Sequence, residues 1–128
     1  MTPLDDASDE LTSVLVEVSD RFAEARLGVT AEVLLPTPAD GGRSVYLCFT
    51  KHDREWLLGI RTISDVGFDD EEFKPIAAAP RFHRVLAANA LPKLLKELQD
   101  KASTMLQDVT TATNQARLFL RGLKEHGL

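Results

Sequence analysis

The C-terminal third of the chain carries apolar residues at alternating steps of four and three. The ten apolar positions are Leu91, Leu95, Leu98, Ala102, Met105, Val109, Ala112, Ala116, Phe119 and Leu123. This spacing forms a narrow seam along one side of a helix and is typical of a helix that packs against another helix. We therefore predict a long heptad-patterned helix, and we expect these residues to bind a partner.

The seam is wider and weaker than that of a strict two-stranded coiled coil. Leu106 and Leu120 flank it, whereas Ala102, Ala112 and Ala116 bury little area. Few opposite charges lie in register beside it, so the sequence shows no ion-pair code that would select a partner. The pattern favours one wall of a helical bundle, formed either within the chain or between two chains.

The length of the predicted helix also bears on its partner. Residues 91–123 would span about 50 Å as one helix, whereas a compact domain of this size is only about 36 Å across. The helix either overhangs its own domain or turns back as a hairpin near Thr110. We favour a continuous helix, because residues 108–114 contain no Gly or Pro and the seam does not slip there.

The preceding residues predict another helix and a small sheet. Apolar residues at helical spacing predict an amphipathic helix over residues 9–27, with Ser8 as its N-cap and Gly28 as its stop, after a flexible segment 1–8. Apolar and polar residues then alternate in three runs separated by turn residues, which is typical of an antiparallel β-meander. These strands are predicted at 29–35, 44–50 and 55–63.

Residues 64–80 are predicted to form a loop leading into the helical tail. Phe73 and Ile76 allow a short fourth strand, which Pro75 would confine to the edge of the sheet. The tail is expected to hold two helices or one kinked helix. In the first case a short helix covers 81–88, and Asn89 is a plausible cap for the long helix, with Pro92 in its first turn.

The predicted fold class is therefore α+β in the order α-β-β-β-α-α. We expect one domain over residues 1–128, with the helix and meander in 9–80 and a helical tail in 81–125 that is used for packing or dimerisation.

The alternation assigns the strand residues to two faces of the sheet. One face is expected to be buried under the helices, and it carries Val45, Leu47, Phe49, Trp56, Leu58 and Ile60. The opposite face carries Tyr46, Cys48 and Arg61, and it is our candidate ligand-binding surface apart from the seam.

Charge and composition exclude several classes of function. The formal net charge of −5 argues against binding to nucleic acid or an anionic membrane. The distribution is uneven, since residues 1–28 carry seven acids and two bases and residues 81–128 carry four acids and eight bases. No stretch is apolar enough to span a bilayer, and the acidic N-terminus does not resemble a secretory signal. With a single cysteine, the chain is expected to be cytoplasmic.

No motif indicates an active site. Cys48, His52 and Asp53 lie close in sequence, but a core cysteine and a turn histidine explain them better than a catalytic or metal-binding pair. The acidic run from Asp65 to Glu72 lacks the ligand spacing of a calcium loop. His83 is expected on a helix surface. We therefore predict no catalytic residues, no metal ligands and no cofactor.

These observations favour a non-catalytic protein-interaction module, a homodimer through its C-terminal helices. One alternative is a small-ligand-binding or enzymatic domain that uses the sheet face near Tyr46 and Arg61. Another is an acidic chaperone-like or inhibitor-like protein that binds a basic partner. In outline only, the element order, the small size and the acidic pI of about 5.1 resemble those of small bacterial secretion chaperones, without a shared motif and without the long tail.

Overall fold

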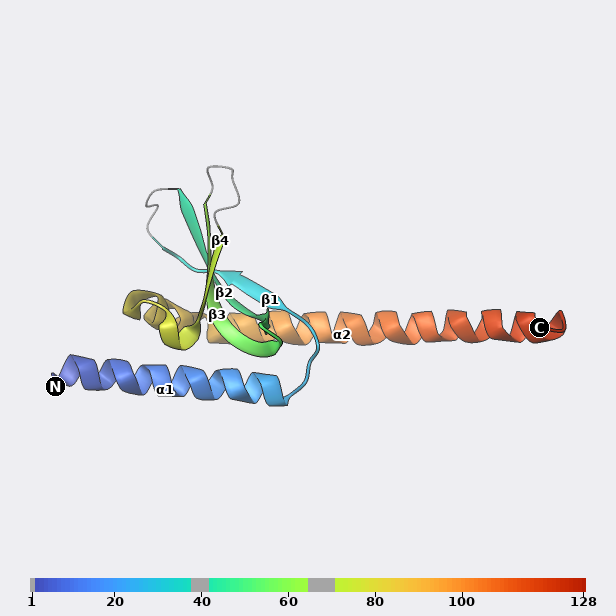
Figure 1. Cartoon of the computed structure of the whole chain (residues 1–128), viewed down its shortest axis with the longest axis horizontal. Helices are drawn as coiled ribbons and strands as arrows, with labels where there is room; N and C mark the ends of the chain where they lie inside the picture. The colour runs from blue at the N-terminus through green and yellow to red at the C-terminus, as the bar shows by residue number, and fades with distance from the viewer. Residues whose placement is uncertain (1, 38–41, 65–70) are drawn as a thin grey trace.

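A computed structural model of the chain describes residues 2–37, 42–64 and 71–128 (Figure 1). The elements in chain order are α1 (Pro3–Glu24), β1 (Ala31–Leu34), β2 (Arg43–His52), β3 (Glu55–Ser64), β4 (Glu71–Pro75), the 3₁₀ helix η1 (Ile76–Ala78) and α2 (Arg81–Glu125). The predicted α+β class is confirmed. The predicted order omitted the fourth strand, although a short edge strand near Phe73 was left open and is present, and the tail is one helix rather than a short helix followed by a long one.

The sheet is an antiparallel meander with the strand order β1-β2-β3-β4. β4 lies at the edge, where Pro75 is tolerated because an edge strand need not donate a hydrogen bond on its outer side. The turn between β2 and β3 consists of Asp53 and Arg54, both with positive φ, which matches the right-handed twist of a tight hairpin. The predicted turn between the first two strands falls largely in residues 38–41, outside the described residues.

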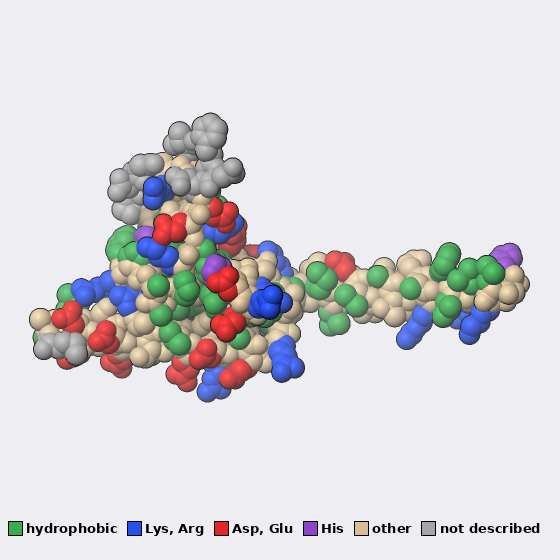
Figure 2. Space-filling view, viewed as in Figure 1, with side chains coloured by type: hydrophobic (Ala, Val, Ile, Leu, Met, Phe, Trp, Pro, Cys, Tyr) green, Lys and Arg blue, Asp and Glu red, His purple; other side chains and the backbone are tan. Residues whose placement is uncertain are grey.

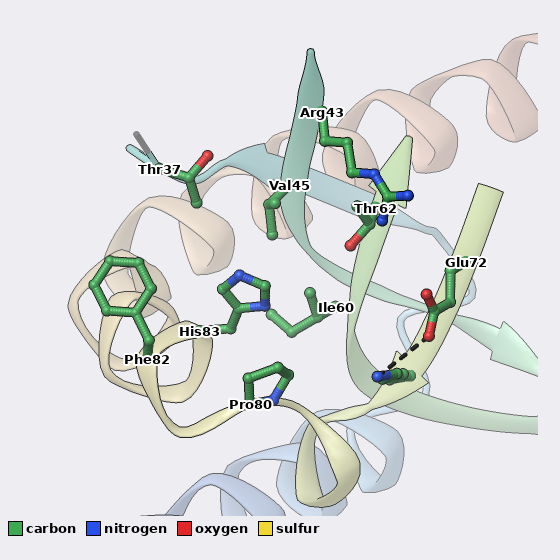
Figure 3. Close-up of a pocket in the computed structure, with 10 residues that line it drawn as sticks. Thr37, Arg43, Val45, Ile60, Thr62, Glu72, Pro80, Phe82 and His83 are labelled. Atoms are coloured by element: carbon green, nitrogen blue, oxygen red, sulfur yellow. Dashed lines mark ion pairs between the residues drawn. The ribbon is translucent and has the colours of Figure 1, made fainter. Parts of the chain in front are cut away.

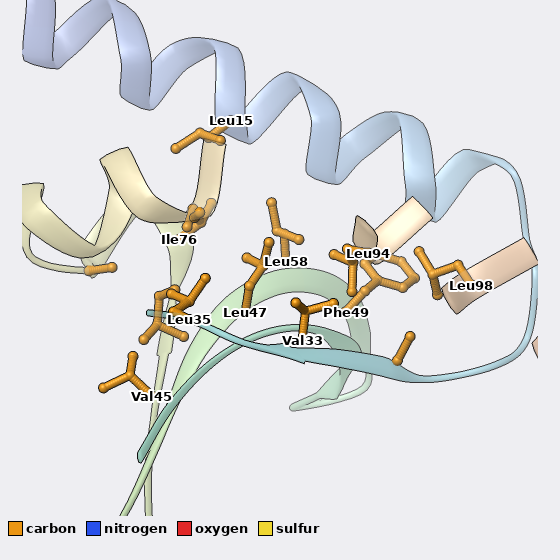
Figure 4. Packing of buried hydrophobic residues seen from close by; sticks show 14 of the residues in the cluster. Leu15, Val33, Leu35, Val45, Leu47, Phe49, Leu58, Ile76, Leu94 and Leu98 are labelled. Carbon is orange, nitrogen blue, oxygen red and sulfur yellow. The ribbon is translucent and has the colours of Figure 1, made fainter. Parts of the chain in front are cut away.

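Both helices pack on the same face of the sheet, α1 mainly against β3 and α2 mainly against β1 and β2 (Figure 4). Leu15 from α1 and Leu94 and Leu98 from α2 are fully buried there. Phe49 makes an edge contact with Phe22 and stacks on Trp56. The predicted core face is confirmed, with Trp56 half-buried and the others buried, which are Val45, Leu47, Phe49, Leu58 and Ile60.

The first helix begins at Pro3, well before the predicted start at residue 9. Thr2 caps it, since its hydroxyl accepts a hydrogen bond from the Asp5 amide at 3.2 Å, and a proline is favourable in the first turn. Ser8 is therefore inside the helix, where it is buried and accepts hydrogen bonds from Arg81 and Arg84 of α2. The segment predicted to be flexible is thus helical from Pro3 onwards and tied to the start of α2.

The second helix runs without interruption for 45 residues, from Arg81 to Glu125, or about 67 Å. The predicted boundary at Asn89 was wrong. Pro92 lies inside the helix and removes one backbone hydrogen bond, but buried residues on both sides, Ala87 and Leu94, hold the two segments on the sheet. Across the seam the helix is continuous, as predicted.

The residues that directly follow α2 determine where the helix ends. Gly127 adopts a φ of 77°, and the Leu128 amide donates to the Leu123 carbonyl at 2.9 Å. These features form a Schellman motif, which closes the helix with a left-handed glycine.

Candidate functional site: the overhang of the last helix

The second half of α2 extends away from the rest of the molecule (Figure 1). We call residues 103–125 the overhang; they span about 34 Å of helix. All of them are exposed except Gly122 and Leu123, which are half-buried near the helix end. The helix leaves the domain soon after its last core residue, Leu98, and therefore overhangs it, as its length predicted.

The structure divides the predicted seam into two parts. In the first part, Leu98 is completely buried in the domain core, Leu91 and Ala102 pack against that core, and Leu95 is 39% exposed. The second part lies on the overhang and consists of Met105, Val109, Ala112, Ala116, Phe119 and Leu123. The first part is largely used within the chain, which narrows the predicted partner surface to the second.

The overhang exposes large apolar side chains, and all but Leu118 lie on one side. Val109 is 54% exposed and Phe119 69% exposed, and the flanking Leu106 and Leu120 are 69% and 53% exposed. Figure 2 shows apolar side chains along this segment, with basic side chains gathered near its end. An extended apolar stripe on a helix surface is typical of a protein-interaction site.

The charges on the overhang are unevenly distributed. Its distal end carries Arg117, Arg121 and Lys124, balanced only by Glu125, whereas its proximal part carries a single acid, Asp108. No helix within the described ranges 2–37, 42–64 and 71–128 is both long and apolar enough to cross a membrane.

A hollow lies where the overhang leaves the domain. It has a volume of about 490 Å³ and is lined on one side by Gly28, Val29 and Thr30, which connect α1 to β1. Its other side is formed by α2, through Asp100, Lys101, Thr104, Met105 and Asp108. Met105 belongs to the seam, so this hollow adjoins the exposed apolar stripe.

The opposite face of the sheet contains the other predicted site residues, and there Arg61 is already engaged. Its guanidinium donates to Glu71 at 3.1 Å and to Glu32, and it lies 5.4 Å from the centre of the Tyr46 ring. Burial alone would lower the pKa of Arg61, but the two carboxylates outweigh it and raise the pKa. A ligand would have to displace these carboxylates before it could pair with Arg61.

Cys48 is buried beneath this face. Its thiol lies 3.5 Å from the Gly59 carbonyl oxygen, and burial raises the pKa of the thiol to about 12. Cys48 and His52 line one hollow of about 430 Å³, but His52 Nε2 lies 3.5 Å from the Asp53 carboxyl group and the His52 ring makes a tilted contact with the Phe73 ring. A thiol with this pKa is not a thiolate at neutral pH, so the geometry does not support a nucleophilic Cys48.

We expect the Cys48 thiol to react slowly in the native protein. At pH 8, DTNB should modify the folded chain at least about 100-fold more slowly than the urea-unfolded chain, because both burial and the raised pKa suppress the thiolate. The rate of absorbance change at 412 nm measures the reaction. Equal rates in the folded and unfolded chains would contradict the buried position of Cys48.

A second hollow, which the sequence did not indicate, lies beside His83 at the start of α2 (Figure 3). It has a volume of about 380 Å³ and combines Ile60 and Phe82 with the basic side chains of Arg43 and Lys74. Burial, and then the charge of Lys74, lower the pKa of His83, so His83 is neutral at pH 7. Its Nδ1 atom is buried without a hydrogen-bond partner among the described residues.

The hollow beside His83 offers hydrogen bonds and positive charge to a small anion. However, Lys74 already pairs with Glu72 at 3.2 Å, which is the ion pair drawn in Figure 3. No sequence motif marks this site, since β2, β3, β4 and α2 supply its residues from distant parts of the chain.

Metal-binding residues do not converge in the part of the chain that the structure describes. Within it, no three His, Cys, Asp or Glu side chains lie together as ligands would. Of the acidic run, Asp65, Asp69 and Asp70 lie outside the described residues. Glu71 and Glu72 point to other partners, since they pair with Arg61 and Lys74.

Comparison of the chain with protein-family models, with curated proteins and with solved structures found no match in any of the three.

Proposed function

We propose that the protein is a non-catalytic interaction module that self-associates through the overhang of α2 and forms a homodimer. The observation that carries this proposal is the continuation of the seam beyond the domain. A stripe that buries Leu98 against the chain's own sheet extends to Met105, Val109 and Phe119, which are half or more exposed. Burial of such side chains against a second helix is the favourable term that drives helix association.

Helix stability supports the same proposal. The proximal overhang contains Thr104, Thr110, Thr111 and Thr113, residues of modest helix propensity. Most helical stability in proteins comes from packing of an apolar face rather than from propensity. A partner helix along the stripe would supply that packing. The net charge of −5 and the acidic α1 argue separately against an anionic surface as the partner.

Removal of the overhang tests the proposal. A chain that ends after Ala102 keeps the core residues Leu94 and Leu98, so we expect it to fold but to remain monomeric. Light scattering after size exclusion should give a dimer mass for the full chain and a monomer mass for the shortened one. Circular dichroism confirms folding of the shortened chain. A shortened chain that still dimerises would place the interface on the domain instead.

The two alternative functions remain weaker proposals. The hollow beside Cys48 and Arg61 favours a small ligand on the open sheet face, but Arg61 is paired there with two carboxylates. The acids of α1 favour a basic protein partner, and binding to such a partner would weaken steeply with added salt. Dimerisation through an apolar seam should depend little on salt, which separates these proposals.

A further inference from the structure

The geometry points to the partner of the overhang: the same segment of a second copy, running antiparallel and centred on Asn114. This inference rests on the proposed self-association and specifies how the two helices meet. In an antiparallel pair with a two-fold axis, the same surface of each copy meets in reverse order. The overhang must therefore complement its own reverse sequence.

The seam meets this requirement when Asn114 lies at the centre. The seam alternates between two sets of heptad positions. With Asn114 at the centre, each residue of one set faces a residue of the other set in the partner helix, as an antiparallel pair requires. The opposed pairs are Met105 with Leu123, Val109 with Phe119, and Ala112 with Ala116. Large side chains meet medium ones at both ends of the contact, and small ones meet at its middle, so the helices approach closely there.

The leucines that flank the seam also pair with each other in this alignment. Leu106 of one copy lies beside Leu120 of the other, and the reverse pair repeats on the far side of the axis. Both leucines are more than half exposed in the single chain. An alignment centred on Asn114 therefore buries the apolar side chains that widen the stripe, which a strict seam would leave exposed.

The boundaries of the overhang support this centre independently of the apolar pattern. The last seam residue that packs against the chain's own core is Ala102, and the Schellman motif ends the helix at Glu125. Asn114 is midway between the first and last residues of the overhang. An antiparallel pair centred there pairs the whole overhang and ends where the partner's domain begins.

A parallel pair fits the domain poorly. It would bring residue 98 of one copy against residue 98 of the other and carry the contact back along the helix. Leu91 and Leu98 are occupied there by the chain's own sheet. The helices would have to separate at Ala102, whereas the antiparallel partner does not reach this region.

The hollow at the base of the overhang lies where the antiparallel partner ends. Met105 lines the hollow and would face Leu123 of the second copy. The apolar end of the partner's seam would therefore lie at the mouth of this hollow.

Disulfide trapping in the full chain tests the register. In a Cys48→Ala background, one chain carries Val109→Cys and a second chain of different mass carries Phe119→Cys; both positions are exposed in the single chain, so folding should persist. In a glutathione buffer, we expect the mixed disulfide to form at least about tenfold more than either self-disulfide, since two copies of position 109 would lie about 15 Å apart along the axis. Asn114→Cys, on the outer side of the helix, is the matched control for random collision.

Light scattering of the same samples separates the possible failures. A dimer that forms mainly self-disulfides at Val109→Cys is parallel, and this would overturn the antiparallel register while leaving self-association standing. A dimer with no disulfide at either position above the Asn114→Cys control would also overturn this register. A monomer at all concentrations would overturn the proposed function and the register with it.

Discussion

Replacing Val109 with glutamate should weaken dimerisation at least 100-fold. Val109 is 54% exposed in the single chain and faces Phe119 of the partner in the antiparallel pair. A dimer contains the substitution twice, and each copy places a carboxylate in an apolar seam. Even about 1.5 kcal/mol per copy adds to about 3 kcal/mol, or roughly a 100-fold rise in Kd.

Asn114→Glu is the matched control, because it adds the same charge on the outer side of the same helix. The concentration dependence of the mass in sedimentation should shift strongly for Val109→Glu and little for Asn114→Glu. Circular dichroism should show that both variants fold. Equal effects of the two substitutions would indicate that net charge, rather than the seam, governs association.

Replacing Gly59 with alanine should destabilise the domain by about 1–3 kcal/mol, as is typical of overpacking in a close contact. A Cβ atom at Gly59 would lie 2.3 Å from Cζ of Phe73 and 2.7 Å from the backbone oxygen of Lys74. The Phe73 ring already lies against the His52 ring, and the Lys74 oxygen belongs to β4, which is paired with β3 in this register. The strands must therefore separate locally. Urea denaturation followed by tryptophan fluorescence measures the loss.

Gly122→Ala is the control for this prediction, since an added methyl group there meets no atom of the described residues within 4 Å. Alanine also has the higher helix propensity, so Gly122→Ala should cost no stability. A Gly59→Ala variant as stable as the native chain would contradict the close approach of β4 and the Phe73 ring to Gly59.

The sequence predicted the two faces of the sheet and the continuity of the seam, because both follow from a local period. The sequence-based prediction was wrong where tertiary contacts determine the bounds of a helix. At Pro92 the local penalty for a proline in a helix is real, but burial of Ala87 and Leu94 holds one helix together. At the start of α1, the sequence contains two candidate N-caps. Ser8 before two acids was chosen, whereas Thr2, followed by Pro3 and Asp5, is the N-cap in the structure.

The candidate site was only partly predictable for a similar reason. The period of the seam gives the side of the helix that is apolar, but not how far the sheet covers it. The boundary at Ala102 depends on where α2 crosses β1 and β2. The pairing of Arg61 with Glu32 and Glu71 likewise joins three strands, so it becomes visible only when the strand register is known.

Sedimentation equilibrium of the unmodified full chain over a wide concentration range is the most direct test of self-association through the overhang. We expect a mass that rises with concentration from 14.1 kDa to twice that value and then stays constant. A mass of 14.1 kDa at every concentration up to about 1 mM, which corresponds to a binding free energy weaker than about −4 kcal/mol, would contradict this expectation.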